Sequence, residues 1–398
     1  MSFEQARDLF LEGLAALQRG ELDLADTRFV ASLEKLPGRP STLMNLGAVR
    51  VARGRPDEAL PVLDELLALE PDNAEAWGHR GTALAALDRH ADAVAAFDRV
   101  LALLPQRPAA LFQRASSLQV LGRVDEALEG FAAVTYAMPT AHLAWTQRGG
   151  ILKDMGRLAE AAECFRQALA HGGDAELNRY FLASVQAAEG DMPAGAPRAY
   201  VQGLFDSYAD SFDQHLVDRL GYRTPQLLAS MLPEDGPVGA VLDLGCGTGL
   251  MAPLLADRAR FIDGVDLSSA MLAKAGALGR YRHLHHGDVA EFMARTTERY
   301  GLVVAADVFV YVGDLAAVLA GAARVLEPGG RLLFSVEEAD AGQVLQLRAS
   351  SRFAHGVDAV VTLAQAHGLV LKALNRATLR HDQGRAIGGA MLLLQAGG

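Results

Sequence analysis

The sequence predicts two architectures in one chain: an all-α helical repeat in the first half and an α/β domain with a mostly parallel sheet in the second. Three observations carry this prediction. Small and large apolar residues recur with a period of 34 residues in the first half. Residues 241–249, VLDLGCGTG, have the pattern of a buried strand that breaks into a glycine loop. Strand-like and helix-like segments then alternate along the second half.

Length and composition limit the number of domains and the class of partner. The chain has 398 residues, and because single hydrophobic cores seldom grow beyond about 250–300 residues, we expect two domains or more. A hydrophobic share of 51% and a charged share of 21% are typical of a globular protein. The formal net charge of −11 provides no basic face for a phosphate backbone, so a nucleic-acid partner is not expected.

The absence of three sequence features indicates the cellular compartment of the protein. The two cysteines, Cys164 and Cys246, have no zinc-like or disulfide-like spacing, which favours a reducing environment. The first residues carry Glu4, Asp8 and Glu12, which a secretory signal would not tolerate. No apolar run approaches the roughly 18 residues of a membrane span, so no membrane partner is expected. These features predict a cytoplasmic protein.

The repeat covers residues 6–175 and places five units in register without an insertion. In each unit a small residue in the first half is matched by a large apolar residue in the second, and a glycine often separates the two halves. This pattern predicts two helices for each unit, closely packed where the small residue lies and filled by the large one. The small residues are Gly13, Gly47, Gly81, Ala115 and Gly149, and the large ones are Phe29, Leu63, Phe97, Phe131 and Phe165.

This unit resembles the tetratricopeptide repeat, and Trp77 and Trp145 occupy a position where that family often has tryptophan. The amphipathic segment that follows, residues 175–189, is expected to cap the stack, which gives a solenoid domain over residues 1–190. The resemblance implies a concave groove built from the first helices. It would bind a protein or peptide partner, or else join two copies of the chain in a homodimer. Its lining residues would be Phe10, Leu14, Met44, Ala48, Gly78, Thr82, Phe112, Ser116, Thr146 and Gly150.

A linker is expected at residues 191–199, where two prolines and a glycine interrupt any regular element. Apolar residues at helical spacing then predict a helix over residues 200–220. The remaining chain, residues 200–398, forms the second domain of the prediction.

The glycine loop at residues 241–249 determines the expected ligand. Its spacing is G-x-G-x-G, whereas a dinucleotide fingerprint is G-x-G-x-x-G with a helix N-terminus facing the pyrophosphate. Asp243 lies two residues before the first glycine, and this carboxylate would repel a pyrophosphate but attract an ammonium or sulfonium group. A cationic ligand is therefore favoured over a nicotinamide dinucleotide and over a purely structural loop.

Acidic residues follow the apolar strands in order. Asp243, Asp266, Asp288 and Asp307 come at or just after the ends of the first four, and ligands of parallel sheets bind at the carboxyl ends of the strands. The expected strands are residues 238–245, 260–267, 280–288, 300–312 and 330–338. Residues 350–355 and 371–396 are expected to belong to a terminal antiparallel hairpin.

The glycine loop with its flanking aspartates resembles motif I of class I S-adenosylmethionine-dependent methyltransferases. Over nearly the whole length, the chain resembles a bacterial family of such enzymes that carry tetratricopeptide repeats, with a methyltransferase domain like those of ubiquinone and biotin pathways. The resemblance implies a Rossmann-like domain with a mostly parallel seven-stranded sheet and S-adenosylmethionine as cofactor. It implies transfer of a methyl group to a small-molecule or a peptide or protein acceptor. The alternative is an interaction scaffold whose methyltransferase-like domain is regulatory or inactive.

The same resemblance assigns the cofactor contacts. Asp266 would bind the two ribose hydroxyls, Asp243 would orient the methionine ammonium, and Asp288 would lie near adenine N6 while Val289 donates its backbone N–H to the ring. The other cofactor-binding candidates are Gly245, Cys246, Gly247, Gly249, Leu267, Met271 and Asp307, with Tyr208 and Tyr222 as covering residues.

A hydroxyl, amine or thiol acceptor also requires a base to take its proton. The catalytic candidates are His355, Asp307 and Tyr311. The segment 305–314, AADVFVYVGD, contains neither the Pro-Pro-Tyr/Phe nor the Pro-Cys motif of DNA methyltransferases, so methylation of DNA bases is not expected.

Three histidines in residues 283–286 also suggest a metal site, but strand alternation would split His283 and His285 from His286. We therefore expect no metal there.

Overall fold

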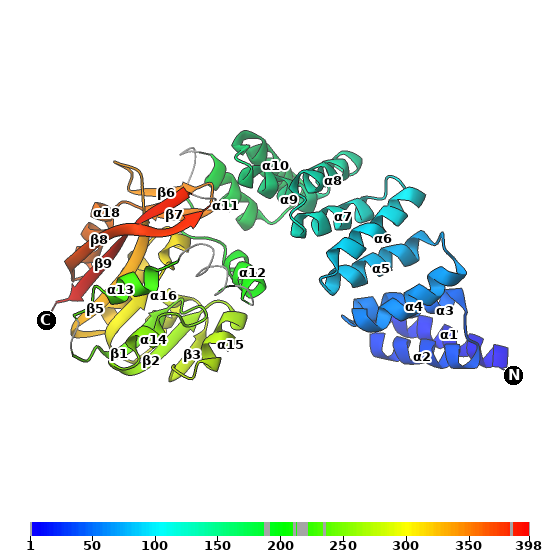
Figure 1. The fold of residues 1–398 in the computed structure, drawn as a ribbon, viewed down its shortest axis with the longest axis horizontal. Coiled ribbons are helices and arrows are strands. Elements are labelled where there is room, and N and C mark those ends of the chain that lie inside the picture. Colours follow the sequence, from blue (N-terminus) through cyan, green and yellow to red (C-terminus); the bar gives the residue numbers. More distant parts are fainter. Residues whose placement is uncertain are drawn as a thin grey trace. The chain divides into compact units, whose positions relative to one another are not determined.

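The computed structural model describes residues 2–186, 192–209, 212, 222–233, 236–382 and 385–397. The chain divides into two compact units, Met1–Asp174 and Ala175–Gly398, whose elements are labelled in Figure 1. Of the helix expected over residues 200–220, residues 210, 211 and 213–220 lie outside the described residues.

The first unit consists of five helix pairs, as the period of 34 residues predicts. In each pair the two helices pack on each other, and each pair packs on the next. The pairs are α1 (Ser2–Gln18) and α2 (Leu22–Lys35), α3 (Pro40–Ala52) and α4 (Pro56–Leu69), α5 (Ala74–Ala86) and α6 (His90–Leu103), α7 (Pro108–Val120) and α8 (Val124–Ala137), and α9 (His142–Asp154) and α10 (Leu158–Ala170).

The recurring glycines allow the two helices of a pair to approach closely. A Cβ atom added to Gly81 would lie 2.7 Å from the ring of Phe97, and one added to Gly149 would lie 2.7 Å from the ring of Phe165. Real Cβ atoms do not come so near, so each phenylalanine occupies the volume that its glycine leaves free. The pairing of small and large residues predicted from the period is confirmed.

The turns within the pairs require a left-handed backbone residue. Glycines with positive φ supply it in four repeats, at Gly20, Gly54, Gly122 and Gly156. In the third repeat Asp88 takes the same conformation, with φ of 57°. Aspartate tolerates this region better than most residues with a side chain, which explains why the turn survives without glycine.

Three of the apolar residues expected to line the groove are less exposed to solvent than the sequence suggested. Phe10, Met44 and Phe112 are all half-buried. The ring of Phe10 lies 5.8 Å from that of Phe29, and the ring of Phe112 lies 5.4 Å from that of Phe131. Part of each side chain therefore fills the space between helices of the unit.

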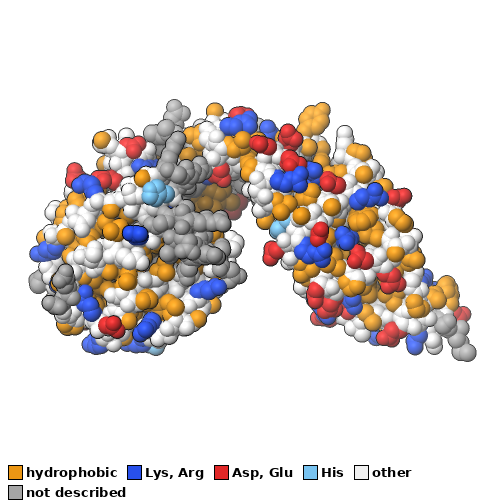
Figure 2. All heavy atoms as spheres, in the orientation of Figure 1, with side chains coloured by type: hydrophobic (Ala, Val, Ile, Leu, Met, Phe, Trp, Pro, Cys, Tyr) orange, Lys and Arg blue, Asp and Glu red, His pale blue; other side chains and the backbone are white. Residues whose placement is uncertain are grey.

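Charges of both signs are mixed on the repeat unit. Figure 2 shows acidic and basic side chains interspersed on the face in view. At the start of the second helices, Arg123 pairs with Glu126 and Arg157 pairs with Glu160, each at 2.7 Å. This distribution agrees with the sequence, which predicted no basic face. Among the described residues, no helix combines the length and apolar character needed to cross a bilayer.

The second unit is built on one mixed sheet. Its main order is β3-β2-β1-β4-β5, all parallel, and β9 and β8 continue it antiparallel on the other side of β5. The strands are β1 (Gly239–Leu244), β2 (Ala259–Asp266), β3 (His283–His286), β4 (Tyr300–Ala305), β5 (Leu326–Glu338), β6 (Leu345–Arg348), β7 (Arg352–His355), β8 (Leu369–Asp382) and β9 (Arg385–Ala396).

The described sheet has nine strands, so the expectation of seven needs correction. β5 continues beyond the end of its neighbour β4, and β7 pairs in parallel with this extension at Glu337 and Glu338. β6 then pairs antiparallel with β7. The additional hairpin thus satisfies the backbone of an extended strand end, and it carries the segment 350–355 that the sequence placed with the terminal hairpin.

Helices connect and cover the strands. They are α11 (Ala175–Val185), α12 (Arg198–Tyr208), α13 (Thr224–Ala229), α14 (Ala252–Leu255), α15 (Ser269–Ala277), α16 (Val289–Arg295), the short 3-10 helix η2 (Phe309–Tyr311), α17 (Ala316–Val325) and α18 (Val357–Ala366). Leu242 and Val241, neighbours on β1, belong to two different apolar clusters. Because side chains alternate along a strand, the sheet is buried on both faces, as the apolar runs predict.

The division between the units falls before α11, earlier than the expected domain boundary after residue 190. Within the second unit, Tyr180 of α11 is buried with Leu347 and Phe353. Its hydroxyl donates a 2.6 Å hydrogen bond to the carbonyl of Ser351. The segment expected to cap the repeats is therefore part of the packing of the sheet unit.

The described part of the expected linker makes backbone hydrogen bonds to the segment around η2. The backbone N–H of Ala196 donates to the carbonyl of Tyr311, and that of Gly313 donates to the carbonyl of Ala194. A proline-rich extended segment leaves its backbone groups unpaired locally, so they bond the turn after η2 instead. This places the start of α12 near the carboxyl end of β4.

Candidate functional site

The glycine loop lies at the carboxyl end of β1, between β2 and β4, where the order of the sheet reverses. Gly245, Gly247 and Gly249 have φ of 60°, 54° and 94°, a region that side chains disfavour. A Cβ at Gly245 would lie 2.6 Å from Val308 and one at Gly249 would lie 2.7 Å from Leu278. A Cβ at Gly247 would meet nothing within 4 Å. Gly247 is thus the glycine of this loop that faces open space.

The Asp266 carboxylate fixes this loop. Its Oδ2 accepts a 2.8 Å hydrogen bond from the backbone N–H of Gly247, and its Oδ1 accepts one of 2.8 Å from the N–H of Ser268. Burial raises the pKa of Asp266, although these N–H groups oppose the shift. The N–H of Leu267 also hydrogen-bonds this carboxylate, and since a carboxylate offers about four acceptor positions, about one is left for a ligand hydroxyl.

Asp243 lies beneath the loop and is almost fully buried, with 2% exposure. Its Oδ2 accepts a 2.7 Å hydrogen bond from the Tyr281 hydroxyl. Burial raises the pKa of Asp243 to about 7, and the bond from Tyr281 limits the rise. Near neutral pH the carboxyl is therefore only partly ionised, and a cation placed beside it would favour the ionised form.

Asp288 serves as the N-cap of α16. Its Oδ1 accepts hydrogen bonds from the N–H groups of Ala290 and Glu291, at 2.9 and 3.0 Å. Its Oδ2 lies 3.4 Å from the guanidinium of Arg198. Val289 is the first residue of the helix, and the first N–H groups of a helix lack intrahelical partners. The proposed contact with an adenine ring stays a prediction.

Three other predicted cofactor residues make contacts within the fold, and their role toward a cofactor stays a prediction. Met271 is fully buried in α15. The carbonyl of Leu267 lies 2.9 Å from Nε2 of His286. Cys246 is buried, and burial raises the pKa of its thiol. This thiol is an inert filler, since a reactive cysteine needs a lowered pKa.

The two tyrosines expected to cover the cofactor differ in environment. Tyr208 is half-buried, and its ring meets that of Phe212 edge-on with centroids 5.6 Å apart. Tyr222 is buried, with 6% exposure, and burial together with the charge of Asp307 raises its pKa well above the usual value. Tyr222 is therefore part of the interior beside the carboxyl ends of the strands.

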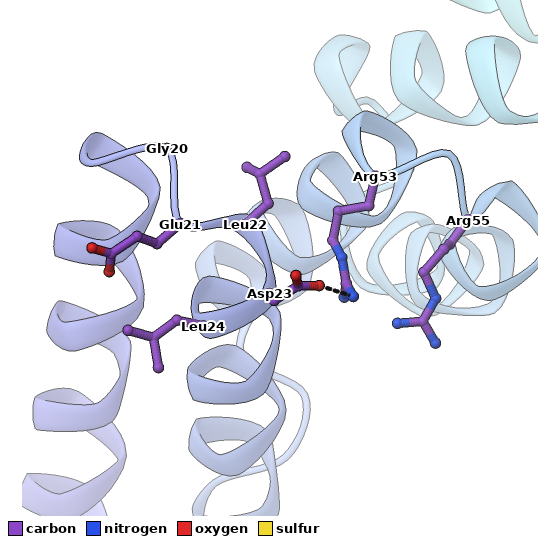
Figure 3. Close-up of a pocket in the computed structure, with 7 residues that line it drawn as sticks. All are labelled: Gly20, Glu21, Leu22, Asp23, Leu24, Arg53 and Arg55. Atoms are coloured by element: carbon purple, nitrogen blue, oxygen red, sulfur yellow. Dashed lines mark ion pairs between the residues drawn. The ribbon is translucent and has the colours of Figure 1, made fainter.

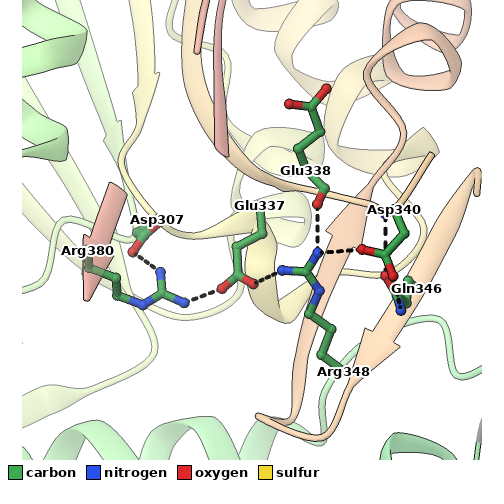
Figure 4. Close-up of polar contacts among 7 residues, drawn as sticks. All are labelled: Asp307, Glu337, Glu338, Asp340, Gln346, Arg348 and Arg380. Atoms are coloured by element: carbon green, nitrogen blue, oxygen red, sulfur yellow. Dashed lines mark hydrogen bonds and ion pairs between the residues drawn. The ribbon is translucent and has the colours of Figure 1, made fainter. Parts of the chain in front are cut away.

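Asp307 belongs to a buried chain of charges that Figure 4 shows. Its Oδ2 accepts a 2.8 Å hydrogen bond from Arg380, a side chain with 4% exposure. Arg380 also pairs with Glu337, which in turn pairs with Arg348 at 3.3 Å. Negative and positive groups therefore alternate, from Asp307 through Arg380 of β8 and Glu337 of β5 to Arg348 of the β6–β7 hairpin.

The backbone at Asp307 is unusual as well. Its φ is 61°, and its N–H donates a 2.9 Å hydrogen bond to the buried hydroxyl of Ser335. Among the described residues, its Oδ1 is buried without a hydrogen-bond partner. The left-handed residue explains why β4 ends at Ala305 rather than running on to residue 312 as expected. Such strain is often found at functional sites.

Tyr311 and His355 both lie at the η2 turn. Arg352 bonds the Tyr311 hydroxyl and lies 5.8 Å from the centre of its ring. Nε2 of His355 lies 2.9 Å from the carbonyl of Val312, so this nitrogen carries the proton. Burial lowers the pKa of His355, and its Nδ1 is buried without a hydrogen-bond partner among the described residues.

The structure brings the predicted residues together in two groups. Asp243, Asp266 and the glycines form one group at the ends of β1 and β2. The catalytic candidates form the other around η2. Sequence reasoning missed the residues that hold both groups in place, which are Tyr281 and Asp206 for the first and Ser335, Glu337, Arg352 and Arg380 for the second. No spacing rule marks them, because each reaches its partner from a distant part of the chain.

The histidines of β3 divide as strand alternation predicts. The rings of His283 and His285 are 6.2 Å apart, and His285 stacks on Phe292. His286 instead contacts the carbonyl of Leu267. The part of the chain that the structure describes contains no group of three or more His, Cys, Asp or Glu residues placed to hold a metal ion.

A shallow pocket also occurs in the repeat unit, between the α1–α2 and α3–α4 turns (Figure 3). An ion pair between Asp23 and Arg53 crosses it. Its lining has no nucleophile set against a base, so we place the chemistry in the second unit. The lining residues are Gly20, Glu21, Leu22, Asp23, Leu24, Arg53 and Arg55.

Family models agree with this division. The methyltransferase domain model matches residues 242–334, which run from β1 to β5. Tetratricopeptide repeat models match residues 44–108, 80–142 and 143–170.

Two curated relatives are named O-methyltransferases. The malonyl-[acyl-carrier protein] O-methyltransferase of Alcanivorax borkumensis is 36% identical over 157 residues, which are 38% of this chain and 52% of the relative. The ubiquinone biosynthesis O-methyltransferase of Aromatoleum aromaticum is 31% identical over 99 residues, 24% of this chain and 42% of the relative. The chain thus spans about half the length of the curated relatives it matches.

Two solved structures are among those similar to this chain. MamA is 25% identical and covers 40% of this chain and 93% of its own, with a TM-score of 0.39. The magnesium protoporphyrin IX methyltransferase of Synechocystis PCC 6803 with bound SAH is 15% identical and covers 50% of this chain and 100% of its own, with a TM-score of 0.40. The family matches support S-adenosylmethionine as the cofactor. The chain combines tetratricopeptide repeats with a methyltransferase domain, as the sequence predicts.

Proposed function

We propose that the chain is an S-adenosylmethionine-dependent methyltransferase that acts on a small-molecule or a peptide or protein acceptor. The observation that carries the proposal is the left-handed glycine loop at the reversal point of the sheet, with two buried carboxylates beside it. Gly247 leaves open space at this loop, and Asp243 and Asp266 lie next to it. Such a set suits a ligand with both a cationic and a ribose part.

The residues fit the cofactor as follows. Asp243 is a buried carboxyl whose ionised form would attract the methionine ammonium. Asp266 is a carboxylate oriented by backbone N–H groups at the loop and would bind the ribose hydroxyls. When bound, S-adenosylmethionine supplies an electrophilic methyl group on a sulfonium centre. The chain's own task is then to place the acceptor in line with that methyl group and to exclude water.

The second group of residues would receive the acceptor. His355 has a neutral ring with a free lone pair on Nδ1, which is the form that a general base requires. Asp307 keeps one buried carboxylate oxygen without a hydrogen-bond partner among the described residues. The curated relatives are named O-methyltransferases, so hydroxyl and carboxyl compounds are the first acceptors to test.

The repeats would recruit a protein or peptide partner, or pair two copies of the chain. Exposed apolar residues on the repeat unit, such as Leu143 with 60% exposure and Val120 with 65%, provide surface for either role. A scaffold with an inactive methyltransferase-like domain is the alternative function.

Two measurements on the full chain test the proposal. Calorimetry with S-adenosylmethionine and S-adenosylhomocysteine should give one site, and the affinity should fall in Asp243→Ala. Radiolabelled S-adenosylmethionine, incubated with cell extracts and with peptide libraries, should then label an acceptor only when the chain is present. Absence of binding would contradict the proposal, and binding without transfer to any acceptor would favour the scaffold.

A further inference from the structure

We propose that Asp206 is a positioning residue for the cofactor site: it acts through Ser268 on Asp266 and the glycine loop. This inference rests on the proposed function, because it concerns how the same site holds the ribose. Asp206 belongs to α12, and the sequence pattern gave it no role.

The first link joins α12 to α15, which contact each other. The Oδ1 atom of Asp206 accepts a 2.6 Å hydrogen bond from the Ser268 hydroxyl and a 3.3 Å bond from the N–H of Ala270. Hydrogen bonding from Ser268 is the main cause that lowers the pKa of Asp206, so the group is an anion at neutral pH. A negative charge at the N-terminus of α15 is also favoured by the helix dipole.

The second link passes through Ser268, which is fully buried. Its hydroxyl oxygen accepts a 3.1 Å hydrogen bond from the N–H of Met271, so Ser268 is the N-cap of α15. The backbone N–H of Ser268 donates a 2.8 Å hydrogen bond to Oδ1 of Asp266. Because the hydroxyl donates to Asp206 and accepts from Met271, one rotamer satisfies both bonds, and the backbone of Ser268 is fixed with it.

The third link reaches the loop. Oδ2 of Asp266 accepts the 2.8 Å bond from the N–H of Gly247. The chain of contacts from α12 therefore ends at the glycine that faces open space. The backbone N–H groups of Ser268, Gly247 and Leu267 all hydrogen-bond the Asp266 carboxylate, so they determine the direction of the acceptor position that remains.

Together these links explain a requirement of the site. A carboxylate that binds two adjacent hydroxyls must be oriented in its plane as well as located, because both hydrogen bonds depend on that plane. Asp206 supplies this orientation from a separate helix. Loss of Asp206 should therefore weaken binding of the ribose part and leave contacts elsewhere on the ligand unchanged.

The test compares two ligands on the full chain by calorimetry: S-adenosylhomocysteine and its 2′-deoxy analogue. The wild type should prefer the ribose form by about tenfold, the order of factor that one hydrogen bond to a charged group provides. In Asp206→Ala this preference should shrink to about twofold, with most of the loss on the ribose ligand. Asp206→Asn, which keeps an acceptor oxygen, should retain part of the preference.

Controls separate positioning from stability. Ser207→Ala changes the next residue of α12, whose hydroxyl donates to the carbonyl of Leu204 on its own helix, and should leave both affinities unchanged. Asp206→Ala and Ser268→Ala should not add in their effect on the ribose preference, since they break one chain of contacts.

The outcomes distinguish the two claims. Equal weakening of both ligands in Asp206→Ala, or an unchanged preference, would overturn the positioning role and leave the proposed function intact. A wild-type chain that binds neither ligand would contradict the proposed function, and the positioning role would fail with it.

Discussion

The carboxylate of Asp266 accepts a 2.8 Å hydrogen bond from the backbone N–H of Gly247, across 19 residues of sequence. An acidic residue at the end of one strand thus holds the loop that follows its neighbour. Since Gly247 has positive φ and open space beside it, the bond stabilises a backbone shape that has no packed side chain of its own.

The glycines of this loop should respond differently to the same substitution. Gly247→Ala places a methyl group in open space, so the fold should lose only about 1–2 kcal/mol for the left-handed backbone, while cofactor binding should fall strongly. Gly245→Ala drives a Cβ to 2.6 Å from Val308 and should lower stability much more. Thermal unfolding and calorimetry on both variants check this. Equal loss of stability in the two variants would contradict the assignment of Gly247 to the ligand side.

Cofactor affinity should depend on pH through Asp243. Its pKa in the fold is about 7, so affinity should rise as pH increases through that value and the carboxylate ionises. The protonated form is favoured in the folded chain more than in the unfolded one. This group therefore stabilises the unliganded fold below the ordinary carboxyl pKa of 3.8, and the contribution is lost as pH rises through about 7.

The Tyr281→Phe variant tests the same group. It removes a hydrogen bond that lowers the pKa of Asp243, so the midpoint of the affinity profile should move to higher pH. Tyr300→Phe is the matched control, because the Tyr300 hydroxyl bonds another buried carboxylate, Asp263, at 3.0 Å. A profile that is the same in all three proteins would show that Asp243 does not face the cation.

Adjacent glycines of α9 test the packing of the repeats. In Gly149→Ala the new Cβ would lie 2.7 Å from the ring of Phe165, so overpacking should cost about 1–3 kcal/mol. In Gly150→Ala the Cβ meets nothing within 4 Å, and the gain in helix propensity should add up to about 1 kcal/mol. Urea unfolding followed by helical circular dichroism measures both. Stabilisation by both substitutions would refute the close approach of α9 and α10.

Arg380 should matter far more than its neighbour on β8. Arg380→Met leaves Asp307 and Glu337 buried without their common cation, which should cost about 3–5 kcal/mol. Arg376→Met removes an exposed pair with Glu338 and should change stability little. Thermal unfolding of the two variants gives the comparison. Similar melting temperatures would mean that the buried charges rearrange without cost.

The limits of the second unit can be checked with fragments. A fragment that begins at residue 175 keeps Tyr180 and its bond to Ser351, and should fold and bind S-adenosylmethionine. One that begins at residue 191, the start of the expected linker, lacks α11 and exposes Phe353, so it should be less stable. Soluble yield and calorimetry with S-adenosylmethionine on both fragments test this prediction. Equal behaviour would support the boundary expected from the sequence.

Much of the fold could be predicted because its signals are local. The period of 34 residues fixed the ten helices of the repeats, and the glycine spacing with Asp243 and Asp266 located the cofactor edge. The expectations that failed were of another kind. The expected seven-stranded sheet lacks the β6–β7 hairpin, because that hairpin depends on where β5 ends relative to β4, which no local pattern records.

The sequence by itself determined the repeat, the order of strands and helices, and the chemistry available at the carboxyl ends of the strands, because helix and strand periods and glycine turns are properties of neighbouring residues. Only the tertiary structure decided which groups hold those residues in place. Arg380 reaches Asp307 across 73 residues, and Asp206 reaches Ser268 across 62. Such contacts follow from the packing of whole elements, so the positioning of the site is encoded in the fold and cannot be read from any one segment.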